Sequence, residues 1–468
     1  IEFLGADYEQ IIGPQGKVGF VFSDTPVKVN YKVTKDGKEA FSKDYEVIVK
    51  GPFSSQGNAK PQTIPSMLQW KGGTGEFRLG DTVKLYCDST KDFCDMLIAD
   101  LKAVTGREVQ VVNAPSEADI VLHTIGANIS SFPTISNALQ EEAYRISVTD
   151  KQVKIMASTP KGKMWGSRSL LQILKQTGGS VPCGDAYDVP RYQVRGVLFD
   201  IARTPYTLED LRKAIDTMAW YKMNDLHLVI NNNYIFLEEY VKDGHDPLKE
   251  AYTAFRLESK MVGKNGQPLT AQDVFFTKKE FRELIDYAKL RGVNIVPEFD
   301  TPGHALSFTK VRPDLIYQGP MGNPGRRSDH IDAGNPETLK FVAEVLDEYL
   351  LPDVETGKAP LEHIKLLRQG LDGVEEPGDI HIEGDQGGTG DMLAHEADIF
   401  QVALGTEVEQ AHLAGHEEHI HHGAENTEDE HTLPLGFFHL AALAQEFLHL
   451  LILPVEDLGD LDTGEVLR

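Results

Sequence analysis

Three ionisable side chains follow one apolar segment closely enough to share a site. The segment VNIVPEFDTPGHA, residues 293–305, places Glu298, Asp300 and His304 at the end of a predicted strand, with a Pro-Gly turn between the last two. A carboxylate beside a histidine can fix the tautomer of the ring and tune its protonation. Such pairs also stabilise loops, so the spacing alone leaves a catalytic and a structural interpretation open.

A second polar pair closes the segment VRGVLFDIAR, residues 194–203, which is typical of a buried strand with polar residues at its end. Arg203 could make forked hydrogen bonds to neighbouring hydroxyl groups of a sugar ring. The alternative is an ion pair between Asp200 and Arg203 that only stabilises the loop.

A third candidate is HIEGDQGG, residues 381–388, where a short apolar strand end opens into a glycine-rich acidic loop. Loops at strand ends hold the catalytic groups of barrel enzymes. The stretch is therefore either part of a catalytic carboxylate pair or an acidic loop.

The histidine run AHLAGHEEHIHHGAEN, residues 411–426, raises the question of a metal site. His416 and His419 lie three residues apart, whereas the H-E-x-x-H zinc motif needs four. A solvated acidic segment explains the composition better. We expect no structural or catalytic metal and no cofactor.

The elements that would position these residues alternate between strand and helix. Helical spacing predicts helices at 208–223, 278–292 and 336–350, and apolar strands end in polar residues at 194–203, 225–233 and 293–305. Candidate functional residues at successive strand ends predict an α/β fold with a (β/α)8 TIM-type barrel. The strand signals after residue 366 are too few to complete eight strands.

Two modules precede the predicted barrel. Residues 1–72 alternate apolar and polar positions around a Lys35-Asp36-Gly37 hairpin turn, which predicts a β-sandwich-like accessory module. Residues 73–188 combine helical and strand patterns, including a helix at 94–106 that stops at a glycine, and predict an α+β domain. The barrel then begins in residues 189–365, and 366–468 form an acidic, histidine-rich region.

Composition limits the class of protein. The 468 residues carry a net charge of −26, which argues against nucleic acid as a partner. No apolar run is long enough to span a membrane. Of the three cysteines, Cys87 and Cys94 could form at most one bridge. Residues 366–468 hold 23 of the 72 Asp and Glu residues but only two of the 46 Lys and Arg residues, and this break needs its own explanation.

Taken together, the segments resemble glycoside hydrolases of family 20, the β-N-acetylhexosaminidases. The resemblance runs through VRGVLFDIAR, MAWYKMNDLHLVINNN, PEFDTPGHA and HIDAGNPETL, and the preceding domain resembles that family's α+β domain. It covers roughly residues 75–350. It implies retaining hydrolysis of terminal β-linked GlcNAc or GalNAc, in which the substrate's own acetamido oxygen attacks the anomeric carbon.

The resemblance also assigns residues. Arg203 matches the arginine that grips the sugar hydroxyls, and Asp300 and His304 match the supporting acid and histidine. Asn232 stands in VINNN where the family usually has an aspartate that supports the histidine. In HIEGDQGG, Asp385 matches the residue that orients the acetamido group, and Gln386 stands where the family has the proton-donating glutamate. A glutamine cannot donate that proton, so an activity loss of ~10²–10⁴-fold is the expected scale.

Three interpretations of residues 366–468 follow from that departure. The chain is a divergent enzyme with an appended acidic segment, or a glycan-binding protein that has lost catalysis. Alternatively, the stretch is not the family's own sequence, for example after a shift of reading frame. No signal peptide opens the chain, but an accessory module on a glycosidase predicts an extracellular or cell-surface location.

Overall fold

The computed structural model describes residues 1–21, 24–51, 57–125, 137–319, 326–354, 356–361 and 368–370. These residues divide into two compact units. Unit 1 comprises 1–197, 215–226 and 287–294, and unit 2 comprises 198–214, 227–286 and the described residues from 295 onward. HIEGDQGG and the histidine run both lie outside the described residues.

The N-terminal part of unit 1 is one antiparallel sheet of β1 (Glu2–Ala6), β2 (Thr25–Lys35), β3 (Lys38–Phe41) and β4 (Tyr45–Val49). The predicted hairpin is confirmed, because Asp36 and Gly37 both have positive φ between β2 and β3. The predicted β-sandwich is wrong for the described residues. The 11-residue β2 pairs with β1 on one edge and with β4 and β3 on the other, so all four strands join a single sheet.

A loop rather than a second sheet covers this sheet. Ile11, Ile12 and Val21 are buried together with Val27 and Val29 of β2. The apolar alternation of β2 therefore reports a one-sided sheet correctly, but it carries no information on what covers the buried side.

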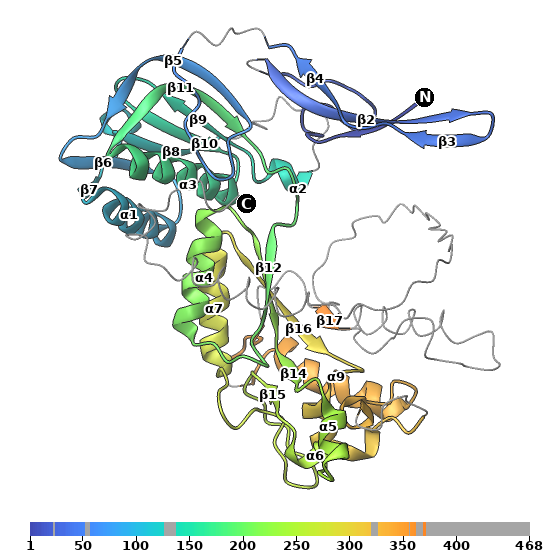
Figure 1. Ribbon diagram of the computed structural model, residues 1–468. Coiled ribbons are helices and arrows are strands. Elements are labelled where there is room, and N and C mark those ends of the chain that lie inside the picture. The colour runs from blue at the N-terminus through green and yellow to red at the C-terminus, as the bar shows by residue number, and fades with distance from the viewer. Residues whose placement is uncertain are drawn as a thin grey trace. The chain divides into compact units, whose positions relative to one another are not determined.

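The α+β domain of unit 1 is a seven-stranded sheet of order β5-β11-β9-β10-β8-β6-β7, with α1 and α3 packed on one face (Figure 1). The strands are β5 (Gln69–Arg78), β6 (Thr82–Cys87), β7 (Glu108–Val111), β8 (Ile120–Thr124), β9 (Tyr144–Val148), β10 (Val153–Ala157) and β11 (Ser180–Asp188). The helices are α1 (Lys91–Thr105), η1 (Pro115–Glu117), α2 (Asn137–Gln140) and α3 (Pro160–Thr177). The helix predicted at 94–106 is confirmed, and it ends at Gly106 in a left-handed cap.

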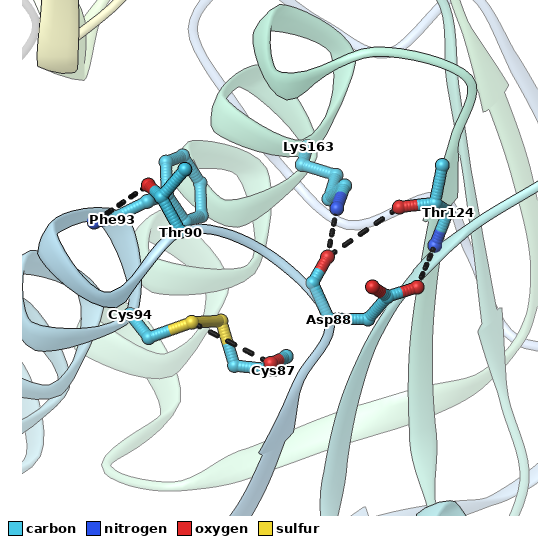
Figure 2. Close-up of a disulfide and its surroundings, with 7 residues drawn as sticks. All are labelled: Cys87, Asp88, Thr90, Phe93, Cys94, Thr124 and Lys163. Carbon is cyan, nitrogen blue, oxygen red and sulfur yellow. Dashed lines mark hydrogen bonds between the residues drawn. A yellow bond between two sulfur atoms is a disulfide. The ribbon is translucent and has the colours of Figure 1, made fainter.

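A disulfide ties the end of β6 to the start of α1. Cys87 and Cys94 are bonded, which is the one bridge that the sequence allowed, while Cys183 is buried and free. Figure 2 shows the neighbouring Asp88, whose carbonyl oxygen accepts hydrogen bonds from Thr124 and Lys163. The bridge therefore lies at a connection that is also fixed by hydrogen bonds from two side chains to a main-chain carbonyl.

The segment from residue 196 supplies strands that alternate with helices. The strands are β12 (Gly196–Asp200), β13 (Asp225–Val229), β14 (Asn231–Asn233), β15 (Thr253–Phe255), β16 (Asn294–Asp300) and β17 (Arg368–Gly370). The helices are α4 (Leu208–Trp220), α5 (Leu237–Lys242), α6 (Pro247–Glu250), α7 (Lys278–Leu290), α8 (Leu306–Val311), η2 (Pro313–Leu315), η3 (Arg326–Asp329) and α9 (Pro336–Leu350). One sheet has the order β12-β13-β16-β17, and β14 pairs with β15.

This part of the chain confirms the predicted strand–helix alternation and its mixed α/β content. The sheet that contains β12, β13 and β16 has four strands among the described residues. In unit 2, a group of buried aromatic rings holds β15 against β16, with Phe255 5.8 Å from Phe299 between ring centroids and Tyr349 of α9 beside both. Phe255 and Phe299 directly precede the polar residues Arg256 and Asp300 in the sequence. The packing of the two rings therefore helps to fix the position of these polar residues.

Candidate active site

The first site element is the turn that follows β12. One carboxylate oxygen of Asp200 accepts the main-chain N–H groups of Ala202 at 3.1 Å and Arg203 at 2.9 Å. The other lies 3.1 Å from Arg203 Nη1, so the ion pair that the sequence left open is present. Arg203 Nε also donates to the carbonyl oxygen of Asn233 at 2.8 Å. Arg203 Nη2 is buried and has no hydrogen-bond partner among the described residues, so the ion pair leaves one donor of the guanidinium unsatisfied.

The second site element is the asparagine run at 231–233, which is fully or almost fully buried. Asn231 exchanges two hydrogen bonds with the main chain of Asp300, at 2.9 Å through its Nδ2 and at 2.8 Å through its Oδ1. Asn232 Nδ2 donates to Asp200 at 3.1 Å. The run therefore links the strand end that carries Asp300 to the strand end that carries Asp200 and Arg203.

The third asparagine extends this network to a further loop. Asn233 Nδ2 donates to the buried carboxylate of Asp329 at 2.9 Å, and its Oδ1 accepts the N–H of Leu306 at 3.2 Å. Asp329 Oδ1 in turn lies 2.7 Å from His330 Nδ1. Because a buried amide needs several partners, three adjacent asparagines specify the relative position of three loops.

The third site element is the Pro-Gly turn after β16. Asp300 is 1% exposed, and its Oδ2 lies 3.6 Å from Nδ1 of His304, whose side chain is 28% exposed. His304 has a φ of 51°, a left-handed conformation that is uncommon outside glycine. Main-chain hydrogen bonds from Ala305 to Asp329 and from Ile331 to Pro302 hold this turn. The fold thus places a partly exposed imidazole over a buried carboxylate.

Aromatic side chains adjoin the first turn. The ring of Tyr206 stacks on Phe199 of β12, with 5.4 Å between centroids. Burial raises the pKa of the Tyr206 hydroxyl, and the negative charges of Asp200 and Asp210 act in the same direction. Tyr206 therefore remains a neutral hydrogen-bond donor over the whole neutral pH range.

The structure brings four of the predicted site residues into one unit. Arg203, Asn232, Asp300 and His304 lie on three chain turns joined by the asparagine run. Asp385 and Gln386 lie outside the described residues, so their roles stay predictions. Sequence reasoning missed Asn231, Asn233 and Asp329; three consecutive asparagines at a strand end were the available signal for the first two.

The described residues contain neither a cluster of metal ligands nor a membrane-spanning helix. Across the described ranges, no group of three or more His, Cys, Asp or Glu side chains is placed to hold a metal ion. In the same part of the chain, no helix combines the length and the apolar character that crossing a bilayer requires.

Two sequence profiles match adjacent parts of the chain. The profile "Glycosyl hydrolase family 20, domain 2" matches residues 60–189, and "Glycosyl hydrolase family 20, catalytic domain" matches 192–353. The second match contains Arg203, Asn232, Asp300 and His304.

Curated relatives agree with these profiles. A "Beta-hexosaminidase" from Akkermansia muciniphila is 32% identical over 221 residues, which cover 45% of this chain and 42% of that protein. A "Lacto-N-biosidase" from Bifidobacterium bifidum is 24% identical over 292 residues, covering 62% of this chain and 23% of that protein. The chain spans less than half the length of these relatives.

Among solved structures, a mutant Streptomyces plicatus beta-hexosaminidase in complex with GlcNAc matches with a TM-score of 0.49 at 21% identity. That match covers 64% of this chain and 59% of the other.

The two adjacent profiles define the class of protein: residues 60–189 and 192–353 are glycoside hydrolase sequence, with a catalytic domain preceded by a second domain. These parts of the chain belong to glycosyl hydrolase family 20.

Proposed function

We propose that the protein acts on glycans that end in β-linked N-acetylhexosamine, as a β-N-acetylhexosaminidase with a (β/α)8 barrel. The observation that carries the proposal is the Arg203 guanidinium, which is held by Asp200 and the Asn233 carbonyl on a side chain that is 29% exposed, within the matched catalytic domain. Fixed donors of this kind suit the neighbouring hydroxyls of a sugar ring. The names of the curated relatives support the substrate class.

The proposed reaction is substrate-assisted and retaining. The substrate's acetamido oxygen attacks the anomeric carbon and displaces the leaving oxygen, which takes its proton from water because Gln386 cannot supply one, and water then opens the resulting ring. Asp385 would orient the acetamido group. Asp300 and His304 would support the site from the turn after β16, where the buried carboxylate favours one imidazole tautomer.

A glycan-binding protein without catalysis is the second candidate, and two observations favour it. Asn232 stands where a carboxylate is expected, and the structure engages its amide with Asp200. Gln386 stands where a proton donor is expected. Binding needs neither a carboxylate at position 232 nor a proton donor at position 386, so the network around Arg203 could recognise a sugar without hydrolysing it.

A chromogenic N-acetylglucosaminide assay beside a binding titration with N-acetylglucosamine separates the two candidates. Turnover at rates comparable with active hexosaminidases supports the enzyme, and binding without turnover supports the binding protein. Absence of both would refute the proposal.

The variant Gln386→Glu restores the missing acid. Because a general acid contributes ~10²–10⁴-fold, a rise of that order in kcat would place Gln386 at the leaving oxygen. No rise in a variant that keeps the wild-type unfolding midpoint would exclude Gln386 from that position.

We also propose that the protein works outside the cytoplasm. The Cys87–Cys94 disulfide supports this, since such bonds persist in oxidising compartments. Fractionation of the source cells with an antibody against the chain tests it, and confinement to the cytoplasmic fraction would contradict it.

A further inference from the structure

One arginine outside the sugar-contacting set is buried directly behind it. Arg256 follows β15, has 0% exposure, and is one of the largest fully buried side chains among the described residues. Its Nε donates to the carbonyl oxygen of Ile201 at 2.9 Å, and its Nη2 donates to that of Ala202 at 2.7 Å. These two carbonyls belong to the turn between Asp200 and Arg203. We infer that Arg256 is a positioning residue for sugar recognition, which holds this turn so that Arg203 faces the ligand.

The inference follows from how the polar groups of the turn are satisfied. The N–H groups of Ala202 and Arg203 are bound by the Asp200 carboxylate, and the N–H of Thr204 is bound by the Asp200 carbonyl at 3.3 Å. The carbonyls of Ile201 and Ala202 point the other way, to Arg256. Without Arg256, two buried carbonyls would lose a charged donor, and the turn would lose its fixed orientation on that side.

Arg256 is itself anchored at its far end. Its Nη1 donates to Asp273 and to the carbonyl of Val274, both at 2.6 Å, and its main chain bonds to Ile230 and Phe276. Asp273 is 43% exposed, so the pair reaches from the interior to solvent. The guanidinium therefore connects the turn after β12 to residues 273 and 274, while the main-chain N–H of Arg256 bonds to the strand end at Ile230.

Lysine cannot take over this role. A guanidinium places five N–H groups in one plane, and here they reach two carbonyls on one side and an acid and a carbonyl on the other. A lysine keeps the charge but has a single nitrogen. Arg256→Lys is therefore the test variant. Arg312→Lys is its control, because Arg312 donates two hydrogen bonds to Asp314, at 2.9 and 2.7 Å, and does not bond to this turn.

The first test measures main-chain hydrogen exchange by mass spectrometry and needs no ligand. In Arg256→Lys, the amides of 202–204 should exchange at least about tenfold faster than in wild type, while Arg312→Lys leaves them unchanged. Unchanged exchange at 202–204 would overturn the inference. If Arg256→Lys does not fold, Asp273→Asn removes the anchor at a half-exposed position and should accelerate the same amides to a smaller extent.

The second test connects Arg256 to Arg203 and rests on the proposed function. We expect Arg256→Lys to weaken N-acetylglucosamine binding about tenfold to a hundredfold, because small displacements of a positioning group have effects of that size. In the double variant with Arg203→Lys, binding should be no weaker than in Arg203→Lys alone. If the losses of binding free energy from Arg256→Lys and Arg203→Lys add in the double variant, the inference is overturned. A residue with only a structural role would affect binding independently of Arg203.

The two tests separate the possible failures. If the wild-type protein binds no N-acetylhexosamine, the proposed function fails, and the exchange measurement alone decides whether Arg256 holds the turn. If the sugar binds but the binding losses of Arg256→Lys and Arg203→Lys are additive, the proposed function stands and the positioning role is refuted.

Discussion

Two nitrogens of the Arg203 guanidinium are bound by neighbouring protein groups. Nη1 and Nε are bound by Asp200 and by the Asn233 carbonyl, which fixes the plane of the group. The sequence singled out Arg203, Asp300 and His304 because each lies in a local segment with a recognisable pattern. It could not predict Arg256 or Asp329, because their contacts join residues tens of positions apart and leave no local signal.

At this scale we expect Arg203→Lys to weaken N-acetylglucosamine binding about 10- to 100-fold, the range for losing charge-assisted hydrogen bonds of ~1.5–3 kcal/mol. An isothermal titration measures the loss. Arg145→Lys is the matched control, since Arg145 forms a comparably exposed pair with Asp185 in unit 1. Equal losses in both variants would show that the effect on binding is not specific to Arg203.

At the scale of elements, the sequence predicted the long amphipathic helices of residues 208–350 well, but it did not predict the short elements α5, α6, β15 and α8 between them. Helices α4, α7 and α9 begin within a residue of their predicted starts. The N-terminal sheet was predicted less well, because alternation along β2 indicates one buried face but not whether a sheet or a loop covers it. Strand β13 was predicted to continue to residue 233, whereas the chain leaves it at Ile230 and starts β14, which pairs with β15.

The first turns of α4 and α7 have reciprocal capping boxes. Thr207 and Asp210 exchange hydrogen bonds at the start of α4, as do Thr277 and Glu280 at the start of α7. The hydrogen bonds from the Thr207 hydroxyl and N–H lower the pKa of Asp210. Those from the Thr277 N–H and hydroxyl lower the pKa of Glu280.

Both carboxyls therefore stabilise the folded state above their ordinary pKa of about 4, and the gain is lost as the pH falls through the lowered folded values. We expect Asp210→Asn with Glu280→Gln to cost about 1 kcal/mol per cap at pH 7 and nothing at low pH. Urea unfolding at several pH values measures this. A cost that persists at pH 2 would contradict a role for the charged forms.

The disulfide acts on the connection between β6 and α1. It closes a short loop, since Cys87 and Cys94 are seven positions apart in the sequence, so loop entropy predicts a loss of about 2.5 kcal/mol on its removal. Replacing both cysteines by alanine and measuring the free energy of unfolding tests this. Cys183→Ala removes the buried free thiol instead and keeps the bridge, so its free energy of unfolding should still fall when reductant is added, whereas that of the double-alanine variant should not change.

At the scale of the whole molecule, the two units share secondary structure elements. Helix α4 has residues 208–214 in unit 2 and 215–220 in unit 1, and α7 and strands β12, β13 and β16 also contribute to both. Helices form cooperatively, so one half of such a helix is not expected to melt while the other stays folded.

We therefore expect both units to unfold in one transition. The three tryptophans, Trp70, Trp165 and Trp220, all belong to unit 1, so their fluorescence reports that unit alone. Hydrogen exchange of residues 295–300 in the same urea series reports unit 2. Coincident midpoints confirm the prediction, and full exchange of 295–300 below the fluorescence midpoint would show independent unfolding.

The turn that carries Asp200 and Arg203 also rests on a cluster of three buried alanines, Ala202, Ala254 and Ala271. Any substitution there other than glycine adds volume to a closed space and displaces the turn. Over evolutionary time, selection for a particular sugar should therefore restrict these positions to small residues even though none of them touches the sugar. Compared across relatives that share a substrate, positions 202, 254 and 271 should vary less than their apolar character alone would allow.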